Sequence, residues 1–199
     1  VSVQQVSDAP SGFTNSVRVT VTTADSSLSS GQYACLQHRI EGYNWADLAY
    51  GTANAQTTTL SFWVKSSVTG TFGGAYTNAS FNRAYPFTFT INSANTWEYK
   101  TITVAGDTSG TWDTSNSVGN RLIFGLGAAS NLSASAGAWT AGTYVSATGA
   151  TNFMATLNAT FQITGVQLEK GSTATSFDYR PYGTELALCQ RYFELARPI

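Results

Sequence analysis

Residues 161–181 read FQITGVQLEKGSTATSFDYRP, and this stretch decides the fold. Strand-forming apolar residues alternate with polar ones along its first half, and the alternation shifts by one position at Gly165. We therefore predict a strand with a β-bulge at Gly165 that closes a β-sandwich. The apolar residues that define this strand are Phe161, Ile163, Val166 and Leu168.

The second half of the same stretch predicts a turn and the end of the core. Lys170-Gly171-Ser172 has the composition of a tight turn. Phe177 follows, and Pro181, whose φ is fixed, comes shortly after it. We expect Phe177 to seal one end of the core.

Other segments alternate in the same way, which predicts further strands. The clearest is 57–66, where Leu60, Phe62 and Val64 occupy one face and Trp63 the other. Short strands at close spacing favour a two-sheet antiparallel jelly-roll sandwich over a βαβ fold, which needs several helices. The other predicted strands are 17–21, 33–40, 85–91, 97–104 and 122–126.

Two segments depart from the strand pattern. Residues 128–152 are rich in Ala, Ser, Thr and Gly, and a loop of that length is usually functional or mobile. Residues 184–196 place Leu186, Cys189 and Phe193 along a helical stripe. We therefore expect a sandwich domain over 1–182 and a helix or connector over 183–199.

The composition excludes several classes of protein. A chain of 199 residues forms one domain with a core that needs no disulfide, and 11% charged residues is far below the usual share. Eleven acids and ten bases provide no basic face for nucleic acid, and no apolar run approaches the length of a membrane span. Cys35 and Cys189 lack metal or redox spacing, so we expect two buried thiols, with a disulfide left open.

Catalytic residues are few. His38 is the single histidine and shares a predicted strand face with Leu36 and Ile40, so we interpret it as a partly buried structural residue. Glu41 and Asp47 could face one cleft, but paired loop acids are common in any domain. We therefore predict that the chain is not an enzyme, with a polysaccharide lyase or hydrolase as an alternative.

Sugar binding needs an aromatic face for the pyranose ring and polar groups for its hydroxyls. Three predicted loops offer that mixture, although a loop tryptophan often caps a core instead. Trp63 is either part of a buried strand or an exposed platform on a sheet, and we expect Trp97 to be in the core. The candidate carbohydrate-binding residues are Trp112, Asp113 and Asn116, then Trp139 and Tyr144, then Tyr43, Trp45 and Asp47.

A bound metal is not expected from the spacing of acids. Asp178 and Asp8 could join backbone carbonyls around a structural Ca²⁺ at an end of the sandwich. The D-x-D-x-D-G type of spacing is absent, so solvated aspartates are the favoured interpretation and no cofactor is predicted.

Several motifs carry a resemblance to a known class of proteins. GVQLEKGSTATSFDYRPYGTELALCQRYFE at 165–194 resembles a segment of bacteriophage tail-fibre and virion structural proteins. LQHRIEG at 36–42, WADLAYGTANAQTTTLSFWVKSSVTGTFGG at 45–74 and NTWEYKTITVAGDTSGTW at 95–112 resemble the same class. These domains are similar to the jelly-roll carbohydrate-binding modules of polysaccharide-degrading enzymes.

The resemblance implies a virion surface domain that binds host or environmental glycans and contacts other virion proteins. It also implies a homo-oligomer, commonly a trimer, in an extracellular setting. A segment usually precedes this region in such proteins, so we expect that Val1 is not the natural start. The alternative is a purely structural virion or connector domain without a ligand.

Overall fold

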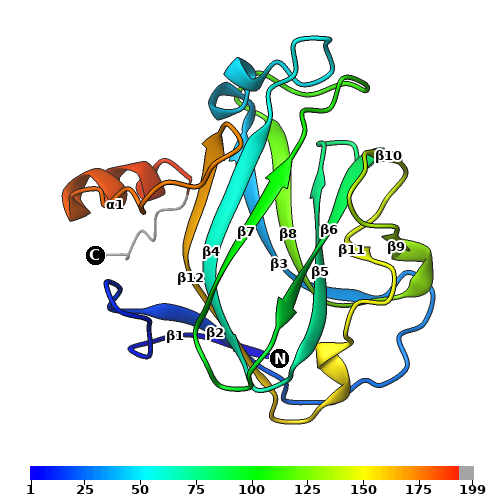
Figure 1. Cartoon of the computed structure of the whole chain (residues 1–199), viewed down its shortest axis with the longest axis vertical. Helices are drawn as coiled ribbons and strands as arrows, with labels where there is room; N and C mark the ends of the chain where they lie inside the picture. Colours follow the sequence, from blue (N-terminus) through cyan, green and yellow to red (C-terminus); the bar gives the residue numbers. More distant parts are fainter. Residues whose placement is uncertain (193–199) are drawn as a thin grey trace, which may run out of the picture.

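The structure is a computed structural model that describes residues 1–192, and it consists of two antiparallel five-stranded sheets packed face to face (Figure 1). This confirms the predicted all-β sandwich. Sheet A has the order β1 (Ser2–Val6), β2 (Ser16–Thr20), β12 (Thr160–Lys170), β4 (Thr58–Ser66) and β7 (Glu98–Val104). Sheet B has the order β10 (Thr140–Ala141), β6 (Arg83–Ile91), β5 (Gly70–Thr77), β8 (Val118–Ala128) and β3 (Tyr33–Glu41).

Strand β12 is the middle strand of sheet A, between β2 and β4. Its register against β4 shifts between Thr164 and Gln167, and Gly165 has a φ of 58°. The predicted bulge is therefore confirmed. A left-handed backbone at this point favours glycine, and the shift keeps apolar residues of both halves of the strand on the inner face.

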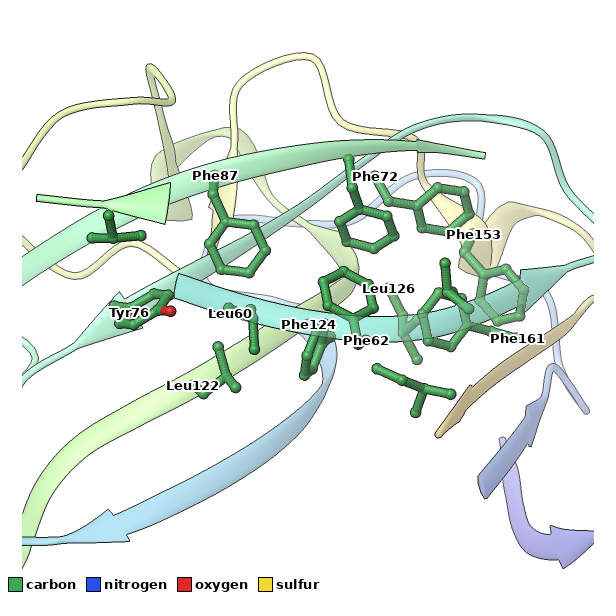
Figure 2. Close-up of a cluster of buried hydrophobic side chains, with 14 of the residues drawn as sticks. Leu60, Phe62, Phe72, Tyr76, Phe87, Leu122, Phe124, Leu126, Phe153 and Phe161 are labelled. Carbon is green, nitrogen blue, oxygen red and sulfur yellow. The ribbon is translucent and has the colours of Figure 1, made fainter. Parts of the chain in front are cut away.

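The core is an aromatic layer between the two sheets (Figure 2). Leu60, Phe62 and Val64 of β4 point into it and are fully buried, as the alternation predicted. The ring of Phe62 lies edge-on to Phe89 and Phe124 of sheet B, with centroids 5.1 and 5.0 Å apart. Edge-to-face packing at these distances adds to the hydrophobic stabilisation of the sandwich.

The segment predicted to be a long loop is ordered and lies along sheet B (Figure 1). Its strand β11 (Ser146–Ala147) pairs in parallel with β9 (Ser133–Ala134) and is buried. A Cβ on Gly73 of β5 would lie 2.3 Å from the Ser146 hydroxyl, so β11 packs directly on the outer face of that strand. The small Ala and Ser side chains of this segment therefore allow close packing on sheet B.

Short helical turns complete the described chain. Four 3₁₀ turns, η1 to η4, cover Gly42–Asn44, Ala46–Leu48, Ser130–Leu132 and Phe153–Ala155. The helix α1 covers Tyr182–Gln190, extends away from the sandwich in Figure 1 and has no buried residue. The part of the predicted helix beyond 192 lies outside the described residues. Within 1–192, no helix combines the length and apolar character needed to cross a bilayer.

The two cysteines are both free. Cys35 is half-buried in β3, and burial raises the pKa of its thiol. Cys189 is exposed on α1, so the prediction of two buried thiols is wrong for this residue. The reason is that no residue of α1 is buried against the sandwich.

Candidate functional site

The outer face of sheet A carries an aromatic pair. Trp63 on β4 lies opposite Tyr99 on β7, and their ring centroids are 5.3 Å apart with the planes inclined at 49°. Trp63 is half-buried and Tyr99 is 44% exposed. Both face away from the core because they alternate with the inward-facing residues of their strands.

This pair forms part of the floor of an open groove of about 600 Å³. Ser61 lies next to Trp63 on the same face of β4, and Gly165 completes the floor from β12. One wall consists of Ser11 and Phe13, and the other consists of residues 174–177 with Tyr179. The groove thus combines flat aromatic rings with hydroxyl groups, the two kinds of group that a sugar ring requires.

The two walls meet in a second aromatic cluster. Phe13 lies edge-on to Phe177 with centroids 5.0 Å apart, and Tyr179 packs within 5.6 Å of both rings. The Tyr179 hydroxyl donates a hydrogen bond of 2.9 Å to the carbonyl of Gly12. The prediction that Phe177 seals the core is therefore wrong, because after β12 the chain turns outward and places this ring on the outer face of sheet A.

Gly165 allows the wall to approach the sheet. A Cβ at this position would lie 2.6 Å from Cζ of Phe13, well inside van der Waals contact. Glycine therefore meets two requirements at this position: it adopts the left-handed backbone of the bulge, and it leaves room for the Phe13 ring where the wall meets the sheet.

Side chains of β12 hold the wall in place. The Gln167 amide accepts from the backbone N–H of Asp178 at 2.7 Å and donates to the carbonyl of Ser176 at 3.2 Å. The Glu169 carboxylate accepts from both the backbone N–H and the hydroxyl of Thr175. The wall is thus a loop fixed by directed hydrogen bonds to a central strand, which favours a preformed site.

A charged cluster lies on the same face of sheet A, beside β1 and β2. The Asp8 carboxylate forms an ion pair with Lys65 and accepts a hydrogen bond of 3.2 Å from the Trp97 indole. The hydrogen bond from Lys65, with another from Gln162, lowers the pKa of Asp8. Trp97 is half-buried on this outer face, so the prediction that it belongs to the core is wrong.

Asp8 and Asp178, the two residues suggested for a Ca²⁺ site, both lie beside cationic side chains. The oxygens of Asp8 are occupied by a cation and two N–H donors, and Asp178 lies 3.7 Å from Arg180. Within residues 1–192, no group of three or more acidic, histidine or cysteine side chains could hold a metal ion. The binding of Ca²⁺ by either aspartate stays a prediction.

Two of the predicted sugar-binding indoles lie inside the molecule. Trp45 is 1% exposed and Trp112 is 7% exposed, and their rings stack with centroids 6.0 Å apart. Trp112 donates its N–H to the buried carboxylate of Asp107, which also forms a bidentate pair with Arg83. These indoles cap the end of the core, and neither presents a free face to a ligand.

Trp139 joins the same cap from the long segment that covers sheet B. Its ring lies edge-on to Trp112 and Tyr50, and its N–H donates to the carbonyl of Ala105 at 2.7 Å. Tyr144 is half-buried, and its ring packs against Gly142, where a Cβ would lie 2.7 Å from the ring. Half-buried Trp139 and Tyr144 therefore contribute to packing more than to an open platform.

The polar members of the predicted loop sites remain at the surface. Tyr43 is 62% exposed, Asp47 and Asn116 are exposed, and Asp47 lies 3.6 Å from Lys170. Asp113 accepts hydrogen bonds from the hydroxyl and the N–H of Ser115, and these bonds lower its pKa. Contact between these residues and a ligand stays a prediction. The indoles predicted to accompany them, Trp45 and Trp112, are buried.

The residues considered for catalysis do not line the groove. His38 lies on β3 and is exposed, whereas we expected a partly buried residue. Local desolvation nevertheless lowers the pKa of its imidazole. Glu41 accepts a hydrogen bond from Tyr192 and pairs with Arg191 at 2.7 Å, and these contacts lower its pKa. His38 and Glu41 both lie on β3.

Trp63 and Tyr99 are the site residues that the sequence prediction omitted. The alternation left Trp63 open as an exposed platform, but it placed Tyr99 on the same side of its strand as Trp97, which we expected in the core. The missing information was the pairing of β4 with β7, which joins the two aromatics. Their separation in sequence gives no sign of that pairing.

A second hollow of about 210 Å³ lies over sheet B. Hydroxyls and small side chains line it, including Ser133, Ser146 and Thr151. It contains no aromatic side chain, so it offers no stacking surface.

Comparisons with known proteins complete the description. No protein-family model matches the sequence, and no curated protein matches it. The enzymatically active domain of tailspike protein 4 of bacteriophage CBA120 is a similar structure, with a TM-score of 0.46 and 14% identity. The match covers 85% of this chain, which spans only 18% of the tailspike chain.

A candidate sugar-binding protein from Bacteroides thetaiotaomicron has the same TM-score of 0.46 and 14% identity, over 85% of this chain and 82% of the other. At such identity the likeness assigns neither site nor ligand. The prediction that the chain is not an enzyme is nevertheless contradicted, because the tailspike domain with a similar arrangement is described as enzymatically active. We therefore withdraw the exclusion of catalysis.

Proposed function

We propose that this domain binds carbohydrate in the groove on the outer face of sheet A. The observation that carries the proposal is the pair of Trp63 and Tyr99 at the floor of an open groove. Aromatic side chains left at the surface of a sheet keep apolar area in water, and such area commonly marks a binding site. A pyranose ring can cover one of these rings with its apolar side while its hydroxyls contact the exposed hydroxyls of the walls.

The resemblance of residues 165–194 to tail-fibre and virion proteins supports a location of this domain on a virion. We propose that the domain is displayed on a virion surface, where it binds host or environmental glycans and assembles with other virion proteins, as a trimer. The exposed helix α1 is the described element best placed to lead toward such partners, because none of its residues is buried by the sandwich.

Native affinity electrophoresis tests the sugar-binding proposal. The wild type is run in gels that contain one of a panel of polysaccharides, beside Trp63→Ala, Tyr99→Ala and Tyr43→Ala. We expect retardation of the wild type by at least one polysaccharide and its loss in Trp63→Ala. An interface indole commonly contributes about 2 kcal/mol or more, which corresponds to at least a tenfold loss of affinity.

Tyr43→Ala tests the predicted loop site, because Tyr43 is an exposed aromatic residue of that site and lies outside the groove. If the groove is the binding site, this variant should bind like the wild type. If Tyr43→Ala loses retardation while Trp63→Ala keeps it, the binding site lies at the predicted loops and the groove proposal is wrong. If no polysaccharide retards the wild type, the structural or connector alternative is favoured.

A further inference from the structure

The charges around the groove restrict the kind of glycan that fits it. Of the described residues, those that line the groove include serine, threonine, glycine, alanine and aromatic side chains, and no Lys, Arg, His, Asp or Glu. An ionised sugar that entered would give up part of its hydration without gaining a cationic partner. Such a transfer is unfavourable even when the ligand is only partly buried.

Two positive charges near the groove, Lys65 and Arg180, are already paired. Lys65 forms an ion pair with Asp8 and also lies 5.4 Å from the centre of the Trp97 ring. Arg180, next to the wall, is shared between Asp178 at 3.7 Å and Glu185 at 3.6 Å. Recruiting either cation for an anionic ligand would therefore break an existing pair.

A fixed negative charge contacts the wall. Glu169 holds Thr175 through two hydrogen bonds, and these bonds lower its pKa despite the opposing effect of partial burial. This carboxylate remains ionised at neutral pH and repels an acidic sugar bound at the wall. The exposed hydroxyls of Ser11 and Ser176, in contrast, can each donate and accept a hydrogen bond, as sugar hydroxyls require.

We propose that the groove accepts an uncharged glycan and excludes polysaccharides that carry carboxylate or sulfate groups. This inference rests on the proposed sugar-binding function and specifies its ligand class. Stacking and neutral hydrogen bonds would provide the affinity, so the binding should be nearly independent of ionic strength.

The test compares polysaccharides that share a backbone and differ in charge. Dextran with dextran sulfate and hydroxyethyl cellulose with carboxymethyl cellulose are two such pairs, to which a wider set of neutral and acidic polymers is added. Affinity electrophoresis measures retardation of the wild type, Trp63→Ala and Tyr43→Ala. We expect retardation by at least one neutral polymer, lost in Trp63→Ala and unchanged between about 0.05 and 0.5 M NaCl.

The outcomes separate the two proposals. Retardation by an acidic polymer that is lost in Trp63→Ala and declines with salt would overturn the neutral-glycan inference while leaving sugar binding in the groove intact. Retardation by any polymer that Trp63→Ala leaves unchanged would place the binding site elsewhere and overturn both. Circular dichroism of each variant establishes that lost retardation is not a consequence of unfolding.

A gain-of-binding variant provides a second measurement. Ser11 is exposed at the rim of the groove and has no charged neighbour in the lining, so Ser11→Arg adds an unpaired cation there. We expect this variant to acquire salt-sensitive retardation by dextran sulfate. A wild type already retarded by dextran sulfate through Trp63 would contradict the inference directly.

Discussion

Trp63 and Tyr99 are cross-strand neighbours on the solvent side of sheet A, with ring centroids 5.3 Å apart. The inner neighbours of Trp63, Phe62 and Val64, are fully buried, so β4 carries large apolar side chains on both faces. Only the inner set is needed for the core. The outer pair therefore represents an apolar surface that packing within the domain does not explain, and a ligand is its natural complement.

Gly165 offers a test of the groove's construction. We expect Gly165→Ala to weaken folding by about 1–3 kcal/mol, because its φ of 58° is unfavourable for alanine and the new Cβ would collide with Phe13. Gly171→Ala is the control: its φ is 116°, but nothing lies within 4 Å of the added Cβ. Urea denaturation and affinity electrophoresis should show that only Gly165→Ala also loses glycan binding. Equal binding losses would argue against the displacement of Phe13.

Gln167 tests whether the wall must be fixed. Gln167→Ala removes the hydrogen bonds to Ser176 and Asp178 while leaving the floor of the groove unchanged. We expect a several-fold weaker affinity because the loop would have to be ordered on binding, with a smaller change in thermal stability. Gln56→Ala, whose side chain bonds only within its own loop, is the control. An unaltered affinity in Gln167→Ala would show that the wall takes no part in binding.

The lowered pKa of Glu98 predicts that the stability of the fold decreases at acid pH. Burial opposes its ionisation, but hydrogen bonds from Lys100, from the N–H groups of Ser93 and Asn92 and from the Asn92 side chain lower its pKa from 4.5 to about 2. Since the folded-state pKa is the lower one, the stabilising contribution is complete above about pH 4.5 and is lost as the pH falls toward 2. Glu98→Gln should flatten the pH dependence of the free energy of unfolding in that window. The same slope in both proteins would refute this assignment.

Arg83 tests the role of the indole cap. Arg83→Ala leaves the buried Asp107 carboxylate without its cation, and we expect a loss of about 3–5 kcal/mol in the free energy of unfolding. Lys170→Ala, which removes an exposed pair with Asp47 at 3.6 Å, should change it by less than about 1 kcal/mol. Both variants should keep glycan binding at temperatures where they are folded. Selective loss of binding in folded Arg83→Ala would instead connect the cap with the ligand site.

The strands of the sandwich could be predicted because burial on one face gives a two-residue period. This worked for β4 and for β12, where the shift of the apolar alternation at Gly165 correctly predicted the bulge. It failed for residues 128–152, because alanine and serine are small enough to pack closely and equally common in loops. Composition alone does not distinguish these two environments.

The site was harder to predict for a different physical reason. An indole in a loop, such as Trp112, and an indole on a strand, such as Trp63, differ in exposure only through tertiary contacts. Trp112 is buried and donates its N–H to Asp107, which is paired with Arg83. Trp63 is only half-buried, because nothing in the described chain covers it completely. Sequence pattern gave the face of the strand but not what lies over it.

The central place of β12 has a consequence for biosynthesis. The β1–β2 hairpin and the β4–β7 pair become one sheet through β12, which the ribosome makes after all of them. Until then the nascent polypeptide exposes unpaired strand edges, and contacts across such long sequence separations form slowly. A chain that stopped before Thr160 would hold two disconnected halves of sheet A, so folding should be a late event and incomplete chains should be prone to aggregate.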